Sequence, residues 1–312
     1  MAIRYLFAAL SEDPSERYDL LLTQLGYESR AVHVTNHLDG RFDQLVAMDY
    51  VSPAVLSYVD NKTFFERLGN IIDPAATGVR SLFEATLFQL ASALGKEEIR
   101  LAIDISSCDR QRLSEIVLAL TTCAMHFPVV VDFYYSVGKF DEAHSQIDEP
   151  VMVNEALRGY EGWTTDPDRP LTCILGVGFE RQFALAALET LEPRQTVVFV
   201  GDGPDARYRA QVDKDNESLL NSRLVAVVGY DVALPLSTLR QLDVLVRATR
   251  ASQRIAVVPL GSKVFALAAI LVGAMYPEDV AVWRVSAGQS REAQDRAASG
   301  PIVGLRLRVS AQ

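Results

Sequence analysis

The sequence holds little of the chemistry that metal sites and disulfide frameworks need. Among its 312 residues are three cysteines and four histidines. The cysteines show no CxxC spacing, and no histidine stands at metal-ligand spacing from a cysteine or carboxylate. A sparse, odd number of cysteines is typical of proteins in a reducing compartment. We therefore predict a cytoplasmic protein with neither a disulfide framework nor a metal site.

The familiar nucleotide-binding and hydrolytic motifs are missing as well. The P-loop pattern GxxxxGK[ST] does not occur, and the glycine run at Gly176 and Gly178 lacks the third glycine of a dinucleotide fingerprint because residue 181 is arginine. No GxSxG elbow is present. ATP hydrolysis, nicotinamide binding and serine-hydrolase chemistry therefore have no support, and we expect no bound cofactor.

Positive charge is in the minority, and long apolar runs are absent. Lysine and arginine number 30 against 40 aspartates and glutamates, for a net charge of −10. A broad nucleic-acid surface needs clustered Lys and Arg, so the charge balance excludes one while leaving room for a local basic pocket. The longest apolar run, 264–276, is too short to span a bilayer. The apolar start at 3–9 is followed by acids, as in a first strand rather than a signal peptide. We expect no membrane association.

Short β-rich apolar runs alternate with helical segments along the whole chain. Hydrophobic residues make up 49% of the sequence, enough for sizeable cores. This alternation is typical of an α/β fold with a doubly wound, mostly parallel sheet. We expect strands at 3–9, 30–35, 70–73, 99–105 and 128–136 in the first half and at 171–177, 196–201, 223–229, 254–259 and 280–286 in the second.

The order of these elements repeats, which predicts two tandem Rossmann-like halves related by internal duplication. We place the first half at 1–138, a polar linker at 139–170, and the second half with a C-terminal strand at 171–312. In this alignment, Glu16-Arg17 falls on Glu180-Arg181 just inside the first helix of each half. Further matches pair Asp60-Asn61 with Asp215-Asn216, and the segment 103–107 with 258–262.

Ligands of open α/β sheets bind beyond the carboxyl ends of the strands. Ser106 and Ser107 follow one such strand, and Gly261, Ser262 and Lys263 follow another. Backbone N–H groups at a strand-to-helix turn favour an anion, glycine allows close approach, and lysine adds a point charge for phosphate. These turns are candidate phosphate sites, although the same residues are common in ordinary βα turns.

Four polar positions that recur in both halves are candidate ligand contacts. Arg17 and Arg181 stand at matched helix starts, where they either face a ligand or are solvated. Asn61 and Asn216 either read a base or ribose by hydrogen bonds or act as turn and cap residues, and we favour the second interpretation.

Three acids stand near expected strand ends and are candidates for acid–base chemistry. Asp104 ends a strand, Asp202 follows the second strand of the second half, and Glu180 opens a helix. Because Pro259 occupies the position that matches Asp104, the two halves are not equivalent there. These three acids remain candidates, and none is assigned a catalytic role.

Two Rossmann-like halves with anion-friendly loops and no catalytic triad resemble the CRISPR-associated Rossmann-fold (CARF) sensors and their tandem relative, the SAVED domain, of bacterial antiviral systems. Gly261-Ser262-Lys263 resembles the glycine, small hydroxyl and lysine of the sensor loop, and Ser106-Ser107 is a weaker copy with Cys108 in place of the lysine. The resemblance implies binding of a nucleotide-type or phosphorylated ligand across the pair of halves.

Three functions remain open at this point. The protein is a ligand sensor that acts through a partner protein or by homo-oligomerisation, an enzyme on a nucleotide or phosphorylated substrate, or a non-catalytic subunit of a defence complex. We favour the sensor over the enzyme. A chain of this length leaves little room for a fused effector beyond the two halves.

Overall fold

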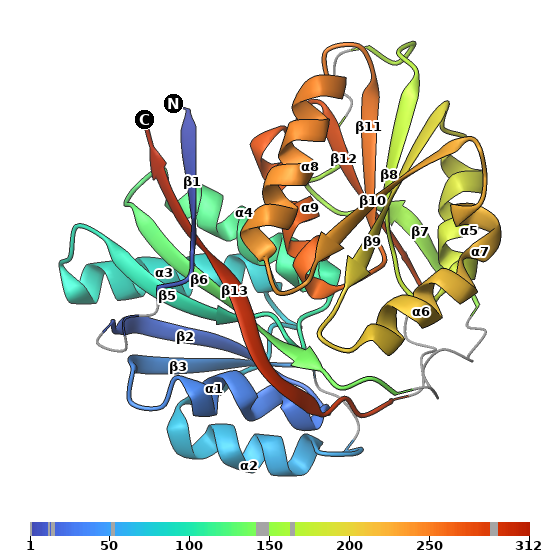
Figure 1. The fold of residues 1–312 in the computed structure, drawn as a ribbon. Helices are drawn as coiled ribbons and strands as arrows, with labels where there is room; N and C mark the ends of the chain where they lie inside the picture. The colour runs from blue at the N-terminus through green and yellow to red at the C-terminus, as the bar shows by residue number, and fades with distance from the viewer. Residues whose placement is uncertain are drawn as a thin grey trace. The chain divides into compact units, whose positions relative to one another are not determined.

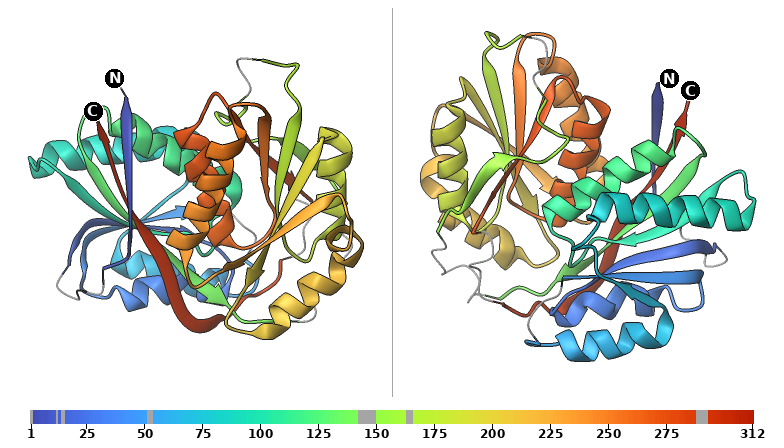
Figure 2. Two further views of the ribbon diagram at one scale, coloured as in Figure 1. Left: turned by 45° about the horizontal axis from the view of Figure 1, so that its top comes forward. Right: turned by 180° about the vertical axis from the view of Figure 1, so that it is seen from behind.

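The computed structural model divides the chain into two compact units. The first comprises Met1–Lys139 together with Ala293–Gln312, and the second comprises Phe140–Glu292. Each unit is an open sheet with helices packed on it (Figure 1, Figure 2). The structure describes residues 2–11, 13, 16–50, 54–141, 150–162, 166–287 and 293–312.

The first unit has a seven-stranded sheet of order β1-β13-β6-β5-β2-β3-β4. The strands from β6 to β4 run parallel, whereas β13 is antiparallel to both β6 and β1. Helices α1 and α2 lie on one face and α3 and α4 on the other (Figure 1). The elements are β1 Ile3–Ala9, β2 Tyr18–Leu25, η1 Ser29–Val32, α1 His33–His37, β3 Phe42–Asp49, α2 Tyr58–Leu68, β4 Asn70–Ile72, α3 Val79–Leu94, β5 Ile99–Asp104, α4 Arg110–Cys123, β6 Val129–Gly138 and β13 Ala298–Ala311.

The second unit has a six-stranded sheet of order β10-β9-β8-β11-β12-β7. Its strands are parallel except for β7, which is antiparallel to β12. Helices α5, α6 and α7 lie on one face and α8 and α9 on the other (Figure 1). The elements are β7 Val153–Ala156, β8 Leu171–Val177, α5 Arg181–Leu191, β9 Gln195–Asp202, α6 Ala206–Asp215, α7 Glu217–Leu220, β10 Val225–Asp231, α8 Pro235–Thr249, β11 Arg254–Pro259, α9 Lys263–Met275 and β12 Val280–Ser286.

The two units repeat one topology. Numbered in chain order, the parallel strands β2 to β6 and β8 to β12 both take the order 3-2-1-4-5, which is that of doubly wound Rossmann-like sheets. The α/β class with two mostly parallel halves is therefore confirmed. β1 and β13 are additions to the first copy, and β7 is an addition to the second.

The register expected for the first half was wrong. Its first core strand is β2, a segment expected to be helical, and all eight of its residues are buried. Residues 30–35, expected as a strand, lie in η1 and α1, and β3 was not expected. The expected strand 3–9 does form, but as the added antiparallel strand β1.

The expected boundaries of the second half also change. Strand β13 does not join the second sheet: it pairs with β1 and β6, so the chain returns to the first unit after residue 292. The close fit of this strand depends on Gly304, where a Cβ would lie 1.9 Å from the carbonyl oxygen of Phe133. Part of the expected linker 139–170 is structured, because β7 pairs with β12.

Candidate functional site

Each unit has one point where the direction of winding reverses. In the first unit it lies between β2 and β5, and in the second between β8 and β11. The helices that follow these paired strands lie on opposite faces of the sheet (Figure 1). The loops at their carboxyl ends therefore diverge, which is where doubly wound folds bind ligands.

The loop after the first core strand has the same sequence pattern in both units. It reads Gly-aromatic-Glu, from Gly26 to Glu28 in the first unit and from Gly178 to Glu180 in the second. The alignment of the two halves in sequence does not reveal this repeat, because it matches β8 with β1 instead of β2.

Two buried asparagines hold these loops. Asn61 Nδ2 donates to the carbonyl oxygens of Gly26 and Glu28, both at 2.9 Å. Asn216 Nδ2 donates to the carbonyl oxygens of Gly178 at 2.8 Å and Val212 at 2.9 Å. The two asparagines thus play the same role in the two units, and their amide groups bind the protein itself.

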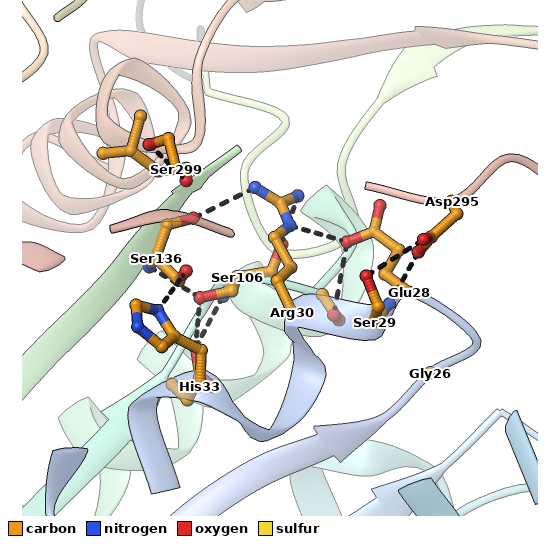
Figure 3. Close-up of polar contacts among 12 residues, drawn as sticks. Gly26, Glu28, Ser29, Arg30, His33, Ser106, Ser136, Asp295 and Ser299 are labelled. Carbon is orange, nitrogen blue, oxygen red and sulfur yellow. Dashed lines mark hydrogen bonds and ion pairs between the residues drawn. The ribbon is translucent and has the colours of Figure 1, made fainter. Parts of the chain in front are cut away.

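In the first unit, a buried arginine fills the winding reversal (Figure 3). Arg30 is 2% exposed. Its Nε lies 2.8 Å from Glu28 Oε2, and its Nη1 and Nη2 donate to the carbonyl oxygens of Ser136 and Ser106, both at 3.0 Å. The guanidinium therefore joins the ends of β2, β5 and β6. Sequence reasoning did not single out this residue.

The serine and aspartate at the end of β5 belong to the same network. Ser106 donates through its amide (2.8 Å) and its hydroxyl (2.5 Å) to Asp104 Oδ1, and its Oγ accepts from the amide of Ser136 at 2.8 Å. Burial raises the pKa of the Asp104 carboxyl to about 6, against the lowering effect of the Ser106 hydrogen bonds. Both side chains are at most 2% exposed, so neither presents a surface to substrate.

Two further side chains complete the network. His33 Nδ1 lies 2.8 Å from Ser136 Oγ (Figure 3). Ser107 Oγ lies 3.4 Å from Glu28 Oε2. Both His33 and Ser107 are half-buried. Because Ser136 is fully buried, the histidine–serine pair is not an exposed nucleophile.

The C-terminal segment closes over this network. Asp295 accepts hydrogen bonds from the amide of Ser29 at 2.6 Å and from its hydroxyl at 2.9 Å (Figure 3). The carbonyl oxygen of Arg296 accepts from the amide of Arg30 at 3.3 Å. Residues that return from the far end of the chain therefore cap η1 at the place where a ligand of the first unit would bind.

In the second unit, the turn at Gly261 and Ser262 is shaped mainly by packing. The Gly261 amide donates to the Gly176 carbonyl oxygen at 2.7 Å, and a Cβ at Gly261 would lie 2.6 Å from the Val177 carbonyl oxygen. Ser262 caps α9, since its Oγ accepts from the amide of Phe265 at 3.2 Å. It also lies 2.9 Å from the hydroxyl of Tyr230.

The charged candidates of the second unit gather around this turn. Lys263 is the half-buried first residue of α9, and Arg181 is the exposed first residue of α5. The two loops touch, because a Cβ at Gly178 would lie 3.5 Å from Gly261 Cα and 3.0 Å from Glu180 Oε2. Lys263, Arg181 and Glu180 are therefore brought to the same end of the sheet.

Asp202 ends β9, next to the loops at the end of β8. Its side chain is 53% exposed and forms an ion pair with Arg209 at 3.0 Å. This acid is open to solvent, in contrast to the buried Asp104. Of the three acidic candidates, Asp202 and Glu180 lie at the carboxyl edge of the second sheet.

An aromatic cluster that sequence reasoning missed lies beside the same loop. Phe179 stacks on Tyr208 with ring centroids 5.3 Å apart and an interplanar angle of 21°. Phe140 packs edge-on against both rings, and the guanidinium of Arg207 lies 5.0 Å from the Phe140 centroid. Once the loop is aligned, Phe179 can be identified as the aromatic of its Gly-aromatic-Glu pattern.

Arg17 lies away from the winding reversal of the first unit. It precedes β2 at the amino end of that strand, donates to the carbonyl oxygen of Gly40 at 2.6 Å, and pairs with Asp43 at 2.8 Å. The expected match between Glu16-Arg17 and Glu180-Arg181 was wrong, because the first pair precedes a strand and the second opens a helix.

Among the described residues, no cluster of three or more His, Cys, Asp or Glu side chains is arranged to hold a metal ion. No helix in the described part of the chain has the length and apolar character needed to cross a membrane. The three cysteines are buried and unpaired with one another.

No protein-family model matches the chain, and no curated protein matches it either. Among solved structures, the chain is similar to a universal stress protein from Archaeoglobus fulgidus DSM 4304, with 10% sequence identity and a TM-score of 0.23. The match covers 87% of this chain and 97% of that chain. A TM-score this low does not show a shared fold. The fold is established by the strand order of the two sheets.

Proposed function

We propose that the protein binds a phosphorylated ligand of nucleotide type at the carboxyl edge of its second sheet, and that it senses this ligand rather than converting it. The observation that carries the proposal is the difference between the two copies of the winding reversal. In the first copy, Arg30 and the segment after residue 292 fill the position. In the second copy, Gln182 stands where the first has Arg30, counting four residues from Gly178 and Gly26.

Charge at the second copy favours an anionic ligand. Lys263 and Arg181 begin the two helices that diverge from the reversal, so two cations lie near two helix N-termini. Helix N-termini and cationic side chains both favour phosphate. Glu180 lies on the same loop, and its carboxylate is suited to accept hydrogen bonds from ligand hydroxyl groups.

The aromatic cluster favours a ligand that carries a base. Phe179 and Tyr208 form a stacked pair next to the loop of Glu180 and Arg181. Aromatic side chains stack on nucleobases without sequence preference, at about 1–3 kcal/mol per base. A nucleotide would stack its base on Phe179 and Tyr208 and place its phosphate near Lys263.

Burial argues against catalysis by the acid at the end of β5. Asp104 is enclosed by the serine network, so it has no path to a substrate. Asp202 and Glu180 remain the acids that turnover would require. The finer prediction, a sensor of oligonucleotide messengers that acts through a partner in antiviral defence, rests on the resemblance of the sequence to the CARF and SAVED group.

The test is a thermal-shift and calorimetry screen of the full chain against mono-, di- and cyclic oligonucleotides, with mass spectrometry to detect turnover. A ligand that binds the folded state raises the melting temperature by mass action. Lys263→Ala is expected to weaken binding about tenfold or more, since a charge-assisted hydrogen bond is lost. Because Lys263 is half-buried, the melting temperature of the free variant is measured as well, so that a loss of stability is separated from a loss of binding.

Lys62→Ala is the matched control, because it removes the same charge from an exposed position of α2 in the first unit. Its affinity should equal that of the unmodified chain. A flat screen, or equal binding by Lys263→Ala, would overturn the proposed site. Chemical conversion of the ligand would show that the protein is an enzyme and not a sensor.

A further inference from the structure

The outer edge of the second sheet is a seven-residue strand whose one charged residue is its last. β10 ends the strand order, and in the described part of the chain it pairs on one side alone, with β9. Its sequence, VAVVGYD, carries no charge before Asp231, and Ala226, Val227 and Gly229 are exposed. The outer N–H and C=O groups of such a strand are a template for another strand.

The corresponding edge of the first sheet is protected. β4 occupies the same place in the 3-2-1-4-5 order but has three residues, against seven in β10. Asp73 and Pro74 follow it directly. Short length, charge and proline are the usual means by which proteins prevent pairing at an edge. β10, by contrast, is longer, contains no proline and carries its one charge at its last residue.

We infer that β10 pairs antiparallel with β10 of a second copy of this chain, which joins two second-unit sheets into one continuous sheet. Identical edge strands that pair across a two-fold axis perpendicular to them run antiparallel, and each surface then meets itself. The axis falls at Val227, which is 45% exposed. In this register Val225 faces Gly229 of the second copy.

Charge at the two ends of the strand selects this partner and this register. Arg223 and Asp231 are both exposed and stand four residues before and four residues after Val227. Arg223 lies in the turn that precedes the strand, so antiparallel pairing about Val227 brings it beside the end of the other β10, where Asp231 lies. An axis nearer to either end of the strand would move these charges apart. Complementary charges at an interface fix register and suppress wrong partners.

An exposed apolar side chain stands directly before this strand. Leu224 is 86% exposed, and within β10 Val227 is 45% exposed. Exposed apolar groups along an edge strand are suited to cover by a partner. A second copy along β10 would cover the strand and Leu224 in particular.

The test is the molar mass of the full chain, measured by sedimentation and light scattering from about 1 to 100 μM, the range in which modest interfaces dissociate. We expect a dimer whose β10 amides are protected from hydrogen exchange. Val227→Lys places two lysines at the two-fold axis and should yield monomers. Val59→Lys makes the same change at an exposed position of α2 and should leave the dimer intact.

A charge swap tests the register. Arg223→Asp places like charges opposite Asp231 and should weaken dimerisation about tenfold or more. The double variant Arg223→Asp/Asp231→Arg restores opposite pairs and should restore the dimer. A monomer at every concentration, or a dimer that survives Val227→Lys, overturns the inference. Neither result depends on ligand binding, so the proposed function is tested separately.

Discussion

Arg30 and Glu28 form an ion pair 2.8 Å apart, with the arginine side chain 2% exposed and the glutamate side chain 18% exposed. The arginine also satisfies two backbone carbonyl groups that end different strands. A buried charge is tolerated when it is paired and fully hydrogen-bonded. The first unit thus holds the protein's own cation at the position where the second unit has Gln182.

Replacing Arg30 with methionine should strongly destabilise the first unit. Breaking a buried ion pair leaves an uncompensated charge and costs about 3–5 kcal/mol. The measurement is urea denaturation of the full chain. Adding Glu28→Gln to Arg30→Met should recover part of the loss, because the unpaired carboxylate is removed. Equal stability of the single variant and the unmodified chain would contradict a structural role for the pair.

The buried carboxyl of Asp104 should make the stability fall as pH rises from about 4 to 6. Its folded pKa is about 6 and its ordinary value is 3.8, so the folded state holds a proton that the unfolded state releases in this interval. The contribution to the pH dependence is at most about 3 kcal/mol. Asp104→Asn keeps the hydrogen-bond acceptor and removes the titration.

Urea denaturation at several pH values between 4 and 7 measures this effect. The Asp104→Asn chain should lose less stability across the interval than the unmodified chain. Parallel curves for the two chains would show that Asp104 has an ordinary pKa in the folded protein.

Glu16 should act with the opposite sign. Hydrogen bonds from Arg306 and Arg100 lower its pKa from 4.5 to about 2, although burial opposes the shift. A lowered folded pKa gives stability that is present above pH 4.5 and is lost as pH falls toward 2. Glu16→Gln should therefore reduce stability at pH 7 by about 1 kcal/mol, after allowance for solvent screening.

Acid titration of unfolding distinguishes Glu16 from an ordinary surface acid. The Glu16→Gln chain should show a shallower loss between pH 4.5 and 2 than the unmodified chain. Glu66→Gln, which changes an exposed residue of α2, is the control and should leave the titration unchanged.

The second unit could be predicted from its sequence almost element by element, whereas in the first the expected strands 3–9, 70–73, 99–105 and 128–136 form but β2 and β3 were missed. Strands 171–177, 254–259 and 280–286 form as expected, and β9 and β10 differ by one or two residues at their ends. In the first half, the leucines of Tyr18–Leu25 cluster as on a helix, yet the segment is a strand buried on both faces. Periodicity alone does not separate these alternatives for short apolar runs.

The candidate site could be predicted only where it depends on residues close together in the sequence. Local turn chemistry identified the segment around Lys263, because a strand-to-helix turn can be recognised from neighbouring residues. The burial of Arg30 and the return of Asp295 depend on pairing between residues far apart in the chain. No local pattern carries that information, so the closure of the first copy became visible in the folded structure alone.

The discontinuous first unit leads to a last prediction, on fragments of the chain. Strand β6 lies between β5 and β13, and all ten of its residues are buried. A fragment of residues 1–139 lacks β13. One edge of β6 is then exposed and β1 has no partner strand, which makes the fragment prone to aggregation. A fragment of residues 140–287 contains the complete second sheet and should fold cooperatively by itself.

A rebuilt first unit provides the control. The amide of Lys139 donates to the carbonyl oxygen of Ala297 at 2.8 Å, so a short glycine–serine linker can join residue 139 to residue 293. The joined chain should be soluble and unfold in one cooperative transition, whereas the fragment 1–139 should not. Cooperative unfolding of 1–139 alone would show that β13 contributes little to the first core. Failure of the joined chain would show that the first unit needs the second to fold.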